Sequence, residues 1–357
     1  MKYFFIVQGE GRGHLTQAIS LYGLLTDSGH EVVEVMVGKN SRLELPQFFY
    51  EKMSPCPILT FASPYFLFSS KSKKSLLLKS IVHNLQKLPA YLKSVAFIRR
   101  RIRESNADLV INFYEILTGL TYAFCRPPKP YVCIAHQYFL LHSRFAFPKA
   151  SRRLEVAALL FFTRLTAINA RRLLALSFRE IPNEGRIHVI PPLLRKEVMQ
   201  QTPRSGSYIL GYVLNADLAE EVVAWHRQHA DIPLHFFWSK KGAPAELRED
   251  DNLVFHQLDD VAFLDYMSRC KAYASTGGFE SICEAMYLQK PVLMVPVHIE
   301  QECNAFDAMN AGAGVASPTF DLTKLIAYLP AYRANADFAG WVGQASRRII
   351  EAITLPL

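Results

Sequence analysis

The chain has 357 residues, 50% of them hydrophobic and 20% charged, a composition typical of a folded protein with about two domains. This composition excludes a disordered chain and a fibrous repeat protein. The net charge of +8 is unevenly divided, because residues 1–200 contain 28 Lys and Arg against 13 Asp and Glu, whereas residues 201–357 contain 12 against 19. The basic first half is therefore expected to meet an anionic partner.

The first half alternates strand patterns with helix patterns. A short apolar run, a loop Gly-Glu-Gly-Arg-Gly-His and a helix-spaced apolar series follow one another, and a second strand pattern completes a βαβ unit. The expected strands of this half cover residues 3–8, 32–37, 108–113 and 130–136. The first half is therefore predicted to be a parallel sheet flanked by helices.

Paired prolines and the loss of helical periodicity near mid-chain indicate a linker, after which the strand and helix alternation restarts. We therefore predict an α/β protein with two Rossmann-like domains that face each other across a cleft. The expected divisions are a first domain at 1–190, a linker at 191–206, a second domain at 207–337 and a C-terminal helix at 338–357.

Two features of the sequence predict a cytoplasmic protein. The six cysteines are widely spaced without a Cys-x-x-Cys pair, which indicates reduced core thiols. The apolar run at 3–7 is too short for the hydrophobic region of a signal peptide, and no run approaches the roughly 18 residues of a membrane-spanning helix.

The strongest functional pattern lies at 274–313, in the second half. A strand ends at Ser275, Gly277 and Gly278 turn the chain, and a helix begins at Phe279. The free N–H groups and positive dipole end of such a helix predict a diphosphate site, to which Ser281 adds a hydroxyl. The alternative is an ordinary turn between a strand and a helix.

Three further polar residues are expected in the same site. Glu284, one helical turn further on, is placed to accept hydrogen bonds from ribose hydroxyls. Glu300 and Gln301 follow the next strand, at the carboxyl end of a parallel sheet, where sugar-recognising groups are expected.

This segment resembles the donor-binding signature of the GT-B nucleotide-sugar glycosyltransferases, specifically the inverting branch. That branch includes the UDP-glycosyltransferases and the lipid-linked N-acetylglucosaminyltransferase of peptidoglycan synthesis. The matching positions are Gly278, Ser281, Glu284, Pro291, Pro296, Glu300, Gln301 and Asn304. The resemblance covers about forty residues closely and the rest of the chain loosely, and it implies a C-terminal helix that crosses back to the first domain.

The chain departs from this signature at three positions. The family's phosphate-contacting His is Thr276, its Asn is Glu280 and its Asp is Glu300. Thr276 still offers a hydroxyl donor to phosphate, whereas Glu280 would repel a diphosphate unless it turned away or was paired. Thr276 also occupies the position where retaining relatives have a Glu, which favours the inverting mechanism.

The loop Gly-Glu-Gly-Arg-Gly-His resembles the glycine-rich first loop of the same enzymes. The resemblance implies that Gly11 and Gly13 allow the backbone to approach the acceptor or a phosphate, and that a His follows, here His14. We interpret His14 as the catalytic base; the alternative is a His at the start of a helix without a chemical role. At the start of a helix the dipole keeps the imidazole neutral, so that it can accept the proton of an attacking hydroxyl. His136, at the end of a first-half strand, is a second candidate for the acceptor site; the alternative is a strand-capping role.

No metal and no cofactor are expected, because the chain has no Asp-x-Asp motif and no His or Cys cluster at ligand spacing. The leaving group would then be stabilised by the helix dipole and N–H donors. The expected ligands are a nucleotide-sugar donor, with UDP favoured, and a hydroxyl acceptor, for which a lipid-linked compound is one interpretation.

The segment Lys71–Arg103 contains ten Lys and Arg, no Asp or Glu, and interleaved apolar residues. We interpret it as a basic amphipathic face for anionic lipid at the inner face of the membrane. The alternative is a solvated helix face. Nucleic acid is not expected, because the chain has no recognisable nucleic-acid-binding motif.

Two other functions are compatible with the fold. One is a non-hydrolysing nucleotide-sugar epimerase, which would need additional acid and base carboxylates. The other is a non-catalytic binding or scaffold subunit. The sequence favours a glycosyltransferase over both.

Overall fold

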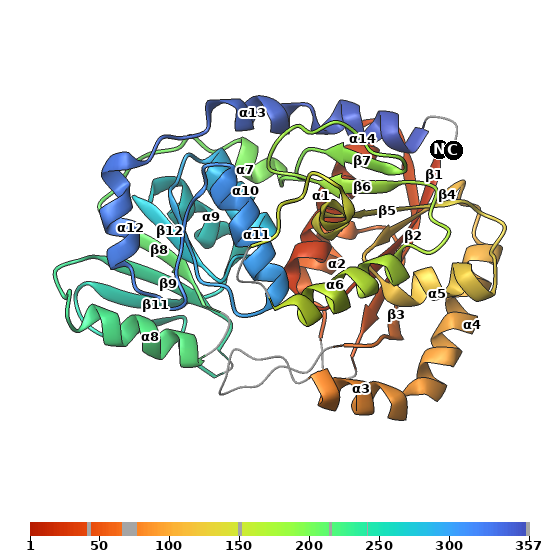
Figure 1. Ribbon diagram of the computed structural model, residues 1–357, viewed down its shortest axis with the longest axis horizontal. Coiled ribbons are helices and arrows are strands. Elements are labelled where there is room, and N and C mark those ends of the chain that lie inside the picture. The colour runs from red at the N-terminus through yellow and green to blue at the C-terminus, as the bar shows by residue number, and fades with distance from the viewer. Residues whose placement is uncertain (41–43, 66–76, 149–151, 214–215, 241, 355–357) are drawn as a thin grey trace.

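The structure is a computed structural model that describes all residues except 41–43, 66–76, 149–151, 214–215, 241 and 355–357. Over the described residues it contains two α/β units, each built on a seven-stranded sheet with helices on both faces (Figure 1). These two parallel-sheet units confirm the predicted fold class.

The first sheet is parallel throughout, in the order β3-β2-β1-β4-β5-β6-β7. Its strands are β1 (Lys2–Gln8), β2 (Glu31–Lys39), β3 (Ile58–Ala62), β4 (Leu109–Phe113), β5 (Tyr131–Ala135), β6 (Leu173–Leu176) and β7 (Ile187–Ile190). The helices of this unit are α1 (Arg12–Asp27), α2 (Gln47–Met53), α3 (Leu77–Gln86), α4 (Leu88–Glu104), α5 (Ile116–Phe124), η1 (His136–Leu141) and α6 (Arg153–Thr166).

Strand β1 is apolar along its whole length because both of its faces are covered. Tyr3, Phe5 and Val7 contribute to one buried cluster, whereas Phe4 and Ile6 contribute to a second cluster on the opposite face. A continuous apolar run is typical of a strand inside a parallel sheet covered by helices.

The second sheet has the order β10-β11-β9-β8-β12-β13-β14, and only its edge strand β10 is antiparallel. Its strands are β8 (Ile209–Tyr212), β9 (Leu234–Trp238), β10 (Glu246–Arg248), β11 (Leu253–Gln257), β12 (Ala272–Ser275), β13 (Val292–Met294) and β14 (Gly314–Ala316). Its helices are α8 (Ala216–His226), α9 (Asp260–Arg269), α10 (Phe279–Tyr287), α11 (Ile299–Asn310), α12 (Thr323–Tyr328) and η2 (Leu329–Ala331). A short helix, α7 (Lys196–Met199), lies in the connection between the sheets.

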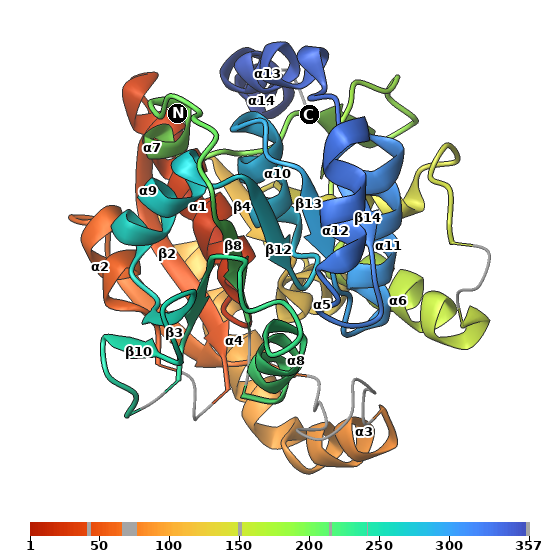
Figure 2. The ribbon, with the colours of Figure 1, turned by 90° about the vertical axis from the view of Figure 1, so that its left-hand side faces the viewer.

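The C-terminal segment returns to the first unit, where α14 (Ala345–Thr354) lies beside β7 (Figure 1). The sequence predicts a single helix over 338–357. The structure has two helices there, since α13 (Ala336–Gly343) ends at Gly343 and α14 starts at Ala345. In the turned view, α13 and α14 lie together at the top of the molecule (Figure 2). Trp341 of α13 is buried and donates its indole N–H to the carbonyl of Ser177 at 2.9 Å. Arg172 of the first unit donates to the carbonyl of Ala352 at 2.7 Å.

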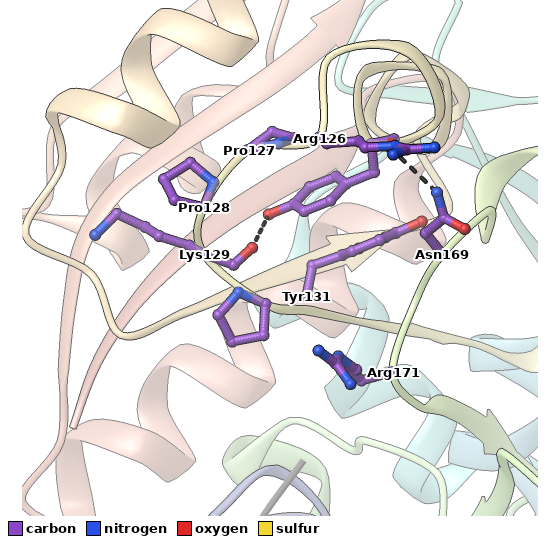
Figure 3. Close-up of a pocket in the computed structure, with 9 residues that line it drawn as sticks. Arg126, Pro127, Pro128, Lys129, Tyr131, Asn169 and Arg171 are labelled. Atoms are coloured by element: carbon purple, nitrogen blue, oxygen red, sulfur yellow. Dashed lines mark hydrogen bonds between the residues drawn. The ribbon is translucent and has the colours of Figure 1, made fainter.

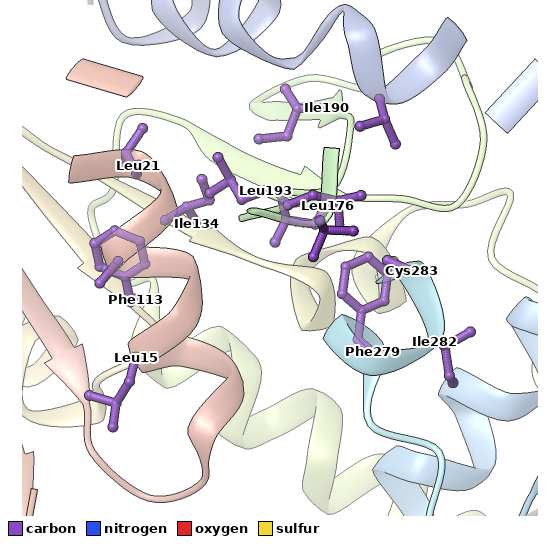
Figure 4. Close-up of a cluster of buried hydrophobic side chains, with 14 of the residues drawn as sticks. Leu15, Leu21, Phe113, Ile134, Leu176, Ile190, Leu193, Phe279, Ile282 and Cys283 are labelled. Carbon is purple, nitrogen blue, oxygen red and sulfur yellow. The ribbon is translucent and has the colours of Figure 1, made fainter. Parts of the chain in front are cut away.

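One buried apolar cluster joins the two units. Figure 4 shows Leu15 and Leu21 of α1 at one side of this cluster and Phe279 and Ile282 of α10 at the other, with Leu176 and Leu193 between them. Since the same cluster contains residues of both sheets, the two units share a core. The position of α10 relative to α1 is therefore fixed by apolar packing.

We expect that Trp341→Ala destabilises the protein by about 3–5 kcal/mol, the usual cost of removing a large buried aromatic side chain. Trp341→Phe keeps most of the apolar volume and loses the bond to Ser177, so that its cost is expected to be about 1 kcal/mol. Denaturant titration measures both values, and hydrogen exchange over 336–354 reports whether the helices detach. Equal stability of the two variants would contradict this account of how the tail docks.

Candidate functional site

The turn between β12 and α10 has the conformation that its sequence predicts. Strand β12 ends at Ser275, and Gly277 has φ 86°, a left-handed conformation in which a side chain would be strained. Gly278 is the N-cap of α10, and no side chain caps its N–H groups. The first amides of α10 therefore keep their capacity to bind an anion.

Hydroxyl groups surround this turn. Ser281 Oγ donates to the carbonyl of Gly278 at 3.2 Å and lies 3.4 Å from Ser275 Oγ. Thr276 is buried, and its Oγ1 accepts a long bond of 3.5 Å from the amide of Gln301. Thr276, Ser281 and Gln301, three of the residues predicted for the site, thus lie around one turn.

Glu284 lies one helical turn into α10 and is buried. Its two carboxylate oxygens accept from Arg195 at 2.8 Å (Nε to Oε1) and 3.0 Å (Nη2 to Oε2). Arg195 belongs to the connection between the sheets, so this bidentate pair ties that connection to α10. Each carboxylate oxygen has two lone-pair sites, and the pair with Arg195 uses one of each.

Glu300 lies in the first turn of α11 and accepts a hydrogen bond from the first unit. Its Oε1 accepts a bond of 2.8 Å from the side-chain amide of Gln137, which lies in η1. Burial lowers the pKa of His14 and raises that of Tyr114, and the charge of Glu300 acts on both as the smaller, upward contribution. Glu300 is therefore close to both the acceptor half and the donor half of the predicted site.

His14 lies in the first turn of α1 and is buried, with 9% of its surface exposed. Its ring stacks on Tyr114 at a centroid distance of 5.4 Å, and its Nδ1 lies 3.3 Å from Gln17 Oε1. Burial lowers the pKa of His14, and this effect outweighs the nearby charge of Glu300 and the bond to Gln17. The ring is therefore neutral near pH 7.

Glu280, in the first turn of α10, faces the first unit. Its Oε1 accepts from Gln17 Nε2 at 2.7 Å, and burial raises the pKa of Glu280 to about 8. The backbone approaches closely here, since a Cβ added to Gly13 would lie 3.6 Å from Glu280 Cγ. Glu280 is thus paired across the boundary between the units and is mainly uncharged below pH 8.

Gly11, just before α1, has φ 79°, which favours glycine. His136 is 1% exposed, and its Nδ1 lies 2.7 Å from the carbonyl of Leu176. Its ring stacks on Phe279 of α10 at 4.0 Å. The structure therefore places His136 in the packing between the units, next to the first residue of α10.

Sequence reasoning missed the side chains that join the predicted residues. Gln17 lies three residues after His14, on the same helix face, and this spacing could have revealed it. No sequence pattern pointed to Arg195 or Gln137 as site residues, because their partners Glu284 and Glu300 are distant in sequence. The same holds for Arg12, whose guanidinium lies 3.2 Å from Asp260.

Two hollows lie on the first unit, away from the residues predicted for the site. One has a volume of about 670 Å³ and lies along α4 and the end of α5, where Leu92 and three arginines line it. The other, of about 490 Å³, surrounds the stacked rings of Tyr122 and Tyr131 and is lined by Arg126, Lys129 and Arg171 (Figure 3). Its nine lining residues include no acidic side chain.

Within the described ranges, no three His, Cys, Asp or Glu side chains lie close enough together to hold a metal ion. No helix of the described part of the chain is both long and apolar enough to span a bilayer.

Comparisons with known proteins agree on one fold. The family model described as "Glycosyl transferase family 1" matches residues 1–331. Among solved structures, LpCGTa in complex with UDP is 14% identical, with 99% of each chain covered and a TM-score of 0.63. The spinosyn rhamnosyltransferase SpnG complexed with thymidine diphosphate is 14% identical, with 98% of this chain and 96% of that chain covered and a TM-score of 0.58. MurG of Acinetobacter baumannii is 14% identical, with 99% of each chain covered and a TM-score of 0.55. A search of curated proteins gives no match.

Proposed function

The chain belongs to glycosyl transferase family 1, and from this premise we propose that it is an inverting enzyme that transfers a sugar from a UDP-linked donor to a hydroxyl acceptor. The observation that carries the proposal is the uncapped start of α10 at the Gly277–Gly278 turn, which is joined to the helix of His14 by a hydrogen bond. Family membership favours sugar transfer over an epimerase or a non-catalytic subunit.

The donor diphosphate would bind at the turn before α10. The amides of the first turn and the hydroxyl of Thr276 are the donors available to it, and Ser281 becomes a further donor when its hydroxyl turns from the carbonyl of Gly278. The ribose hydroxyls would donate to the lone pairs of Glu284 that the Arg195 pair leaves free. Glu300 and Gln301 would contact the sugar. UDP is favoured because LpCGTa binds UDP, and dTDP is the second candidate because SpnG binds thymidine diphosphate.

The acceptor would approach the loop of Gly11 and Gly13. His136 would contribute to this site by packing against Phe279, the first residue of α10. The hydroxyl proton of the acceptor passes to Nε2 of His14 while the acceptor oxygen forms a bond to the anomeric carbon. The bond from that carbon to the diphosphate breaks, and the electron pair leaves with the diphosphate. The amides of α10 then stabilise the added negative charge. We propose this step without a metal ion because the chain has no Asp-x-Asp motif.

We also propose that the first unit docks on anionic lipid and takes its acceptor there. Residues 71–76 of the predicted segment Lys71–Arg103 lie outside the described residues. In the described part, Leu85 and Leu92 are 63% and 61% exposed, and Phe124, at the end of the neighbouring α5, is 80% exposed.

Cations accompany these apolar groups. Three arginines line the hollow beside Leu92, and Arg126, Lys129 and Arg171 line the second hollow (Figure 3). The chain from Phe124 to Arg126 connects the two hollows. Apolar side chains that enter a headgroup region beside cations are the features of a peripheral membrane surface.

A donor site at α10 predicts that UDP stabilises the protein, by about 2.7 kcal/mol at 100 times its dissociation constant. Glu284→Gln should weaken UDP binding by about 1–3 kcal/mol, because a charged acceptor of the ribose bonds is lost. Thermal unfolding with and without UDP or dTDP measures the stabilisation, calorimetric titration measures the affinity, and Glu220→Gln on α8 is the matched control. If Glu284→Gln lowers the melting temperature but leaves the UDP affinity unchanged, Glu284 only supports Arg195.

If His14 is the base, His14→Ala should reduce turnover by about 10²–10⁴ while the UDP affinity changes little. Turnover is measured by release of the nucleoside diphosphate, and His188→Ala on β7 serves as the control. Wild-type turnover in His14→Ala would reject the assignment. Glu10, whose pKa burial raises to about 7, would then be the next candidate.

A lipid-docking surface predicts sedimentation with anionic but not neutral vesicles, and release as salt shortens the Debye length below about 10 Å. Phe124→Asp should weaken vesicle binding. Val261→Asp, at a residue that is 81% exposed on α9 of the second unit, should not. Equal binding to both vesicle types, or none to either, would reject the surface.

A further inference from the structure

Three side chains form a hydrogen-bonded chain across the boundary between the two units. His14 Nδ1 lies 3.3 Å from Gln17 Oε1, and Gln17 Nε2 donates to Glu280 Oε1 at 2.7 Å. His14 and Gln17 lie on α1 of the first unit, whereas Glu280 lies on α10 of the second. Gln17 is 3% exposed, so water has little access to replace either bond.

We propose that Gln17 is a positioning residue, which holds the proton of His14 on Nδ1 because Glu280 of the second unit fixes the orientation of its amide. This inference rests on the proposed role of His14 as the base.

The direction of the bonds follows from what each atom can do. The amide nitrogen of Gln17 faces Oε1 of Glu280, which accepts its bond, so the proton of the neutral carboxyl belongs on Oε2 and the amide oxygen of Gln17 faces His14. An amide oxygen only accepts, and Nδ1 of His14 must therefore be the donor. In a neutral ring the lone pair then lies on Nε2, the atom that the reaction requires.

The surroundings of His14 favour a neutral ring in this tautomer. Burial lowers the pKa of His14, and Tyr114 covers one face of the ring. Glu300 is the nearby charge, and it stabilises the imidazolium that forms when Nε2 takes the proton. The bond to Gln17 persists in that state, because Nδ1 remains a donor throughout.

The bond between Gln17 and Glu280 makes the orientation of His14 depend on both units. Burial raises the pKa of Glu280 to about 8, while the bond from Gln17 and the charge of Arg195 act in the opposite direction and the charge of Glu284 adds to the rise. With Glu280 removed, the amide of Gln17 is free to rotate and to present its nitrogen to His14. The ring would then carry its proton on Nε2 and could not act as a base. The base is therefore oriented only while α10 lies against α1.

The direct test is the tautomer of His14, read from ¹⁵N shifts and long-range ¹H–¹⁵N correlations of the full chain with labelled histidine. We expect a protonated Nδ1 and an unprotonated Nε2 in the wild type, and a loss of this preference in Gln17→Met and in Glu280→Met. A protonated Nε2 in the wild type, or an unchanged tautomer in Gln17→Met, overturns the proposal. This readout does not use turnover, so it fails or holds independently of whether His14 is the base.

Kinetics give the second readout. Gln17→Met should lower kcat by about 10²-fold, at the low end of what a general base contributes, with little change in the KM for the donor. Glu280→Met should behave similarly, whereas Glu280→Gln keeps an acceptor oxygen and should restore most of the turnover. Thr16→Ala, on the same helix but outside the hydrogen-bonded chain, is the matched control. In the His14→Ala background, Gln17→Met should have no further effect on kcat, and an equal further loss would contradict a role through His14.

Discussion

The contact of α10 with the first unit is the constraint on which the site depends. Phe279, the first residue of α10, lies against His136 at 4.0 Å and against Phe178 at 4.7 Å between ring centroids. The apolar cluster below it contains residues of both sheets. Since the glycine turn comes directly before Phe279, this packing determines where the predicted diphosphate site lies relative to α1.

Burial at this boundary has an electrostatic consequence. A charged carboxylate or imidazolium loses its hydration there, so the uncharged forms are favoured. The pKa of Glu280 is raised to about 8 by burial and that of His14 is lowered. Glu280 stands where the signature that this segment resembles has an Asn, and because it is mainly protonated and bound to Gln17 it would not repel the diphosphate proposed for this turn.

The uneven charge of the two halves has a structural use. Arginines of the basic half pair with acidic residues of the acidic half, and these pairs lie along the boundary between the units. They are Arg12–Asp260, Arg152–Glu302, Arg179–Asp307 and Arg195–Glu284. Part of the cationic excess therefore serves contact between the units, and the arginines of α4 remain at a different surface of the first unit.

The sequence by itself determined the two parallel sheets, the glycine turn at 277–278 and the start of α10, because each follows from apolar periodicity or local turn chemistry. It did not determine which side chains meet. Gln17 and Glu280 are 263 positions apart, and their contact exists only because apolar packing brings α1 against α10. The ion pair of Arg195 with Glu284 likewise forms only where the connection between the sheets packs against α10. Long-range partners of this kind depend on how the units pack, and no local pattern in the chain encodes that packing.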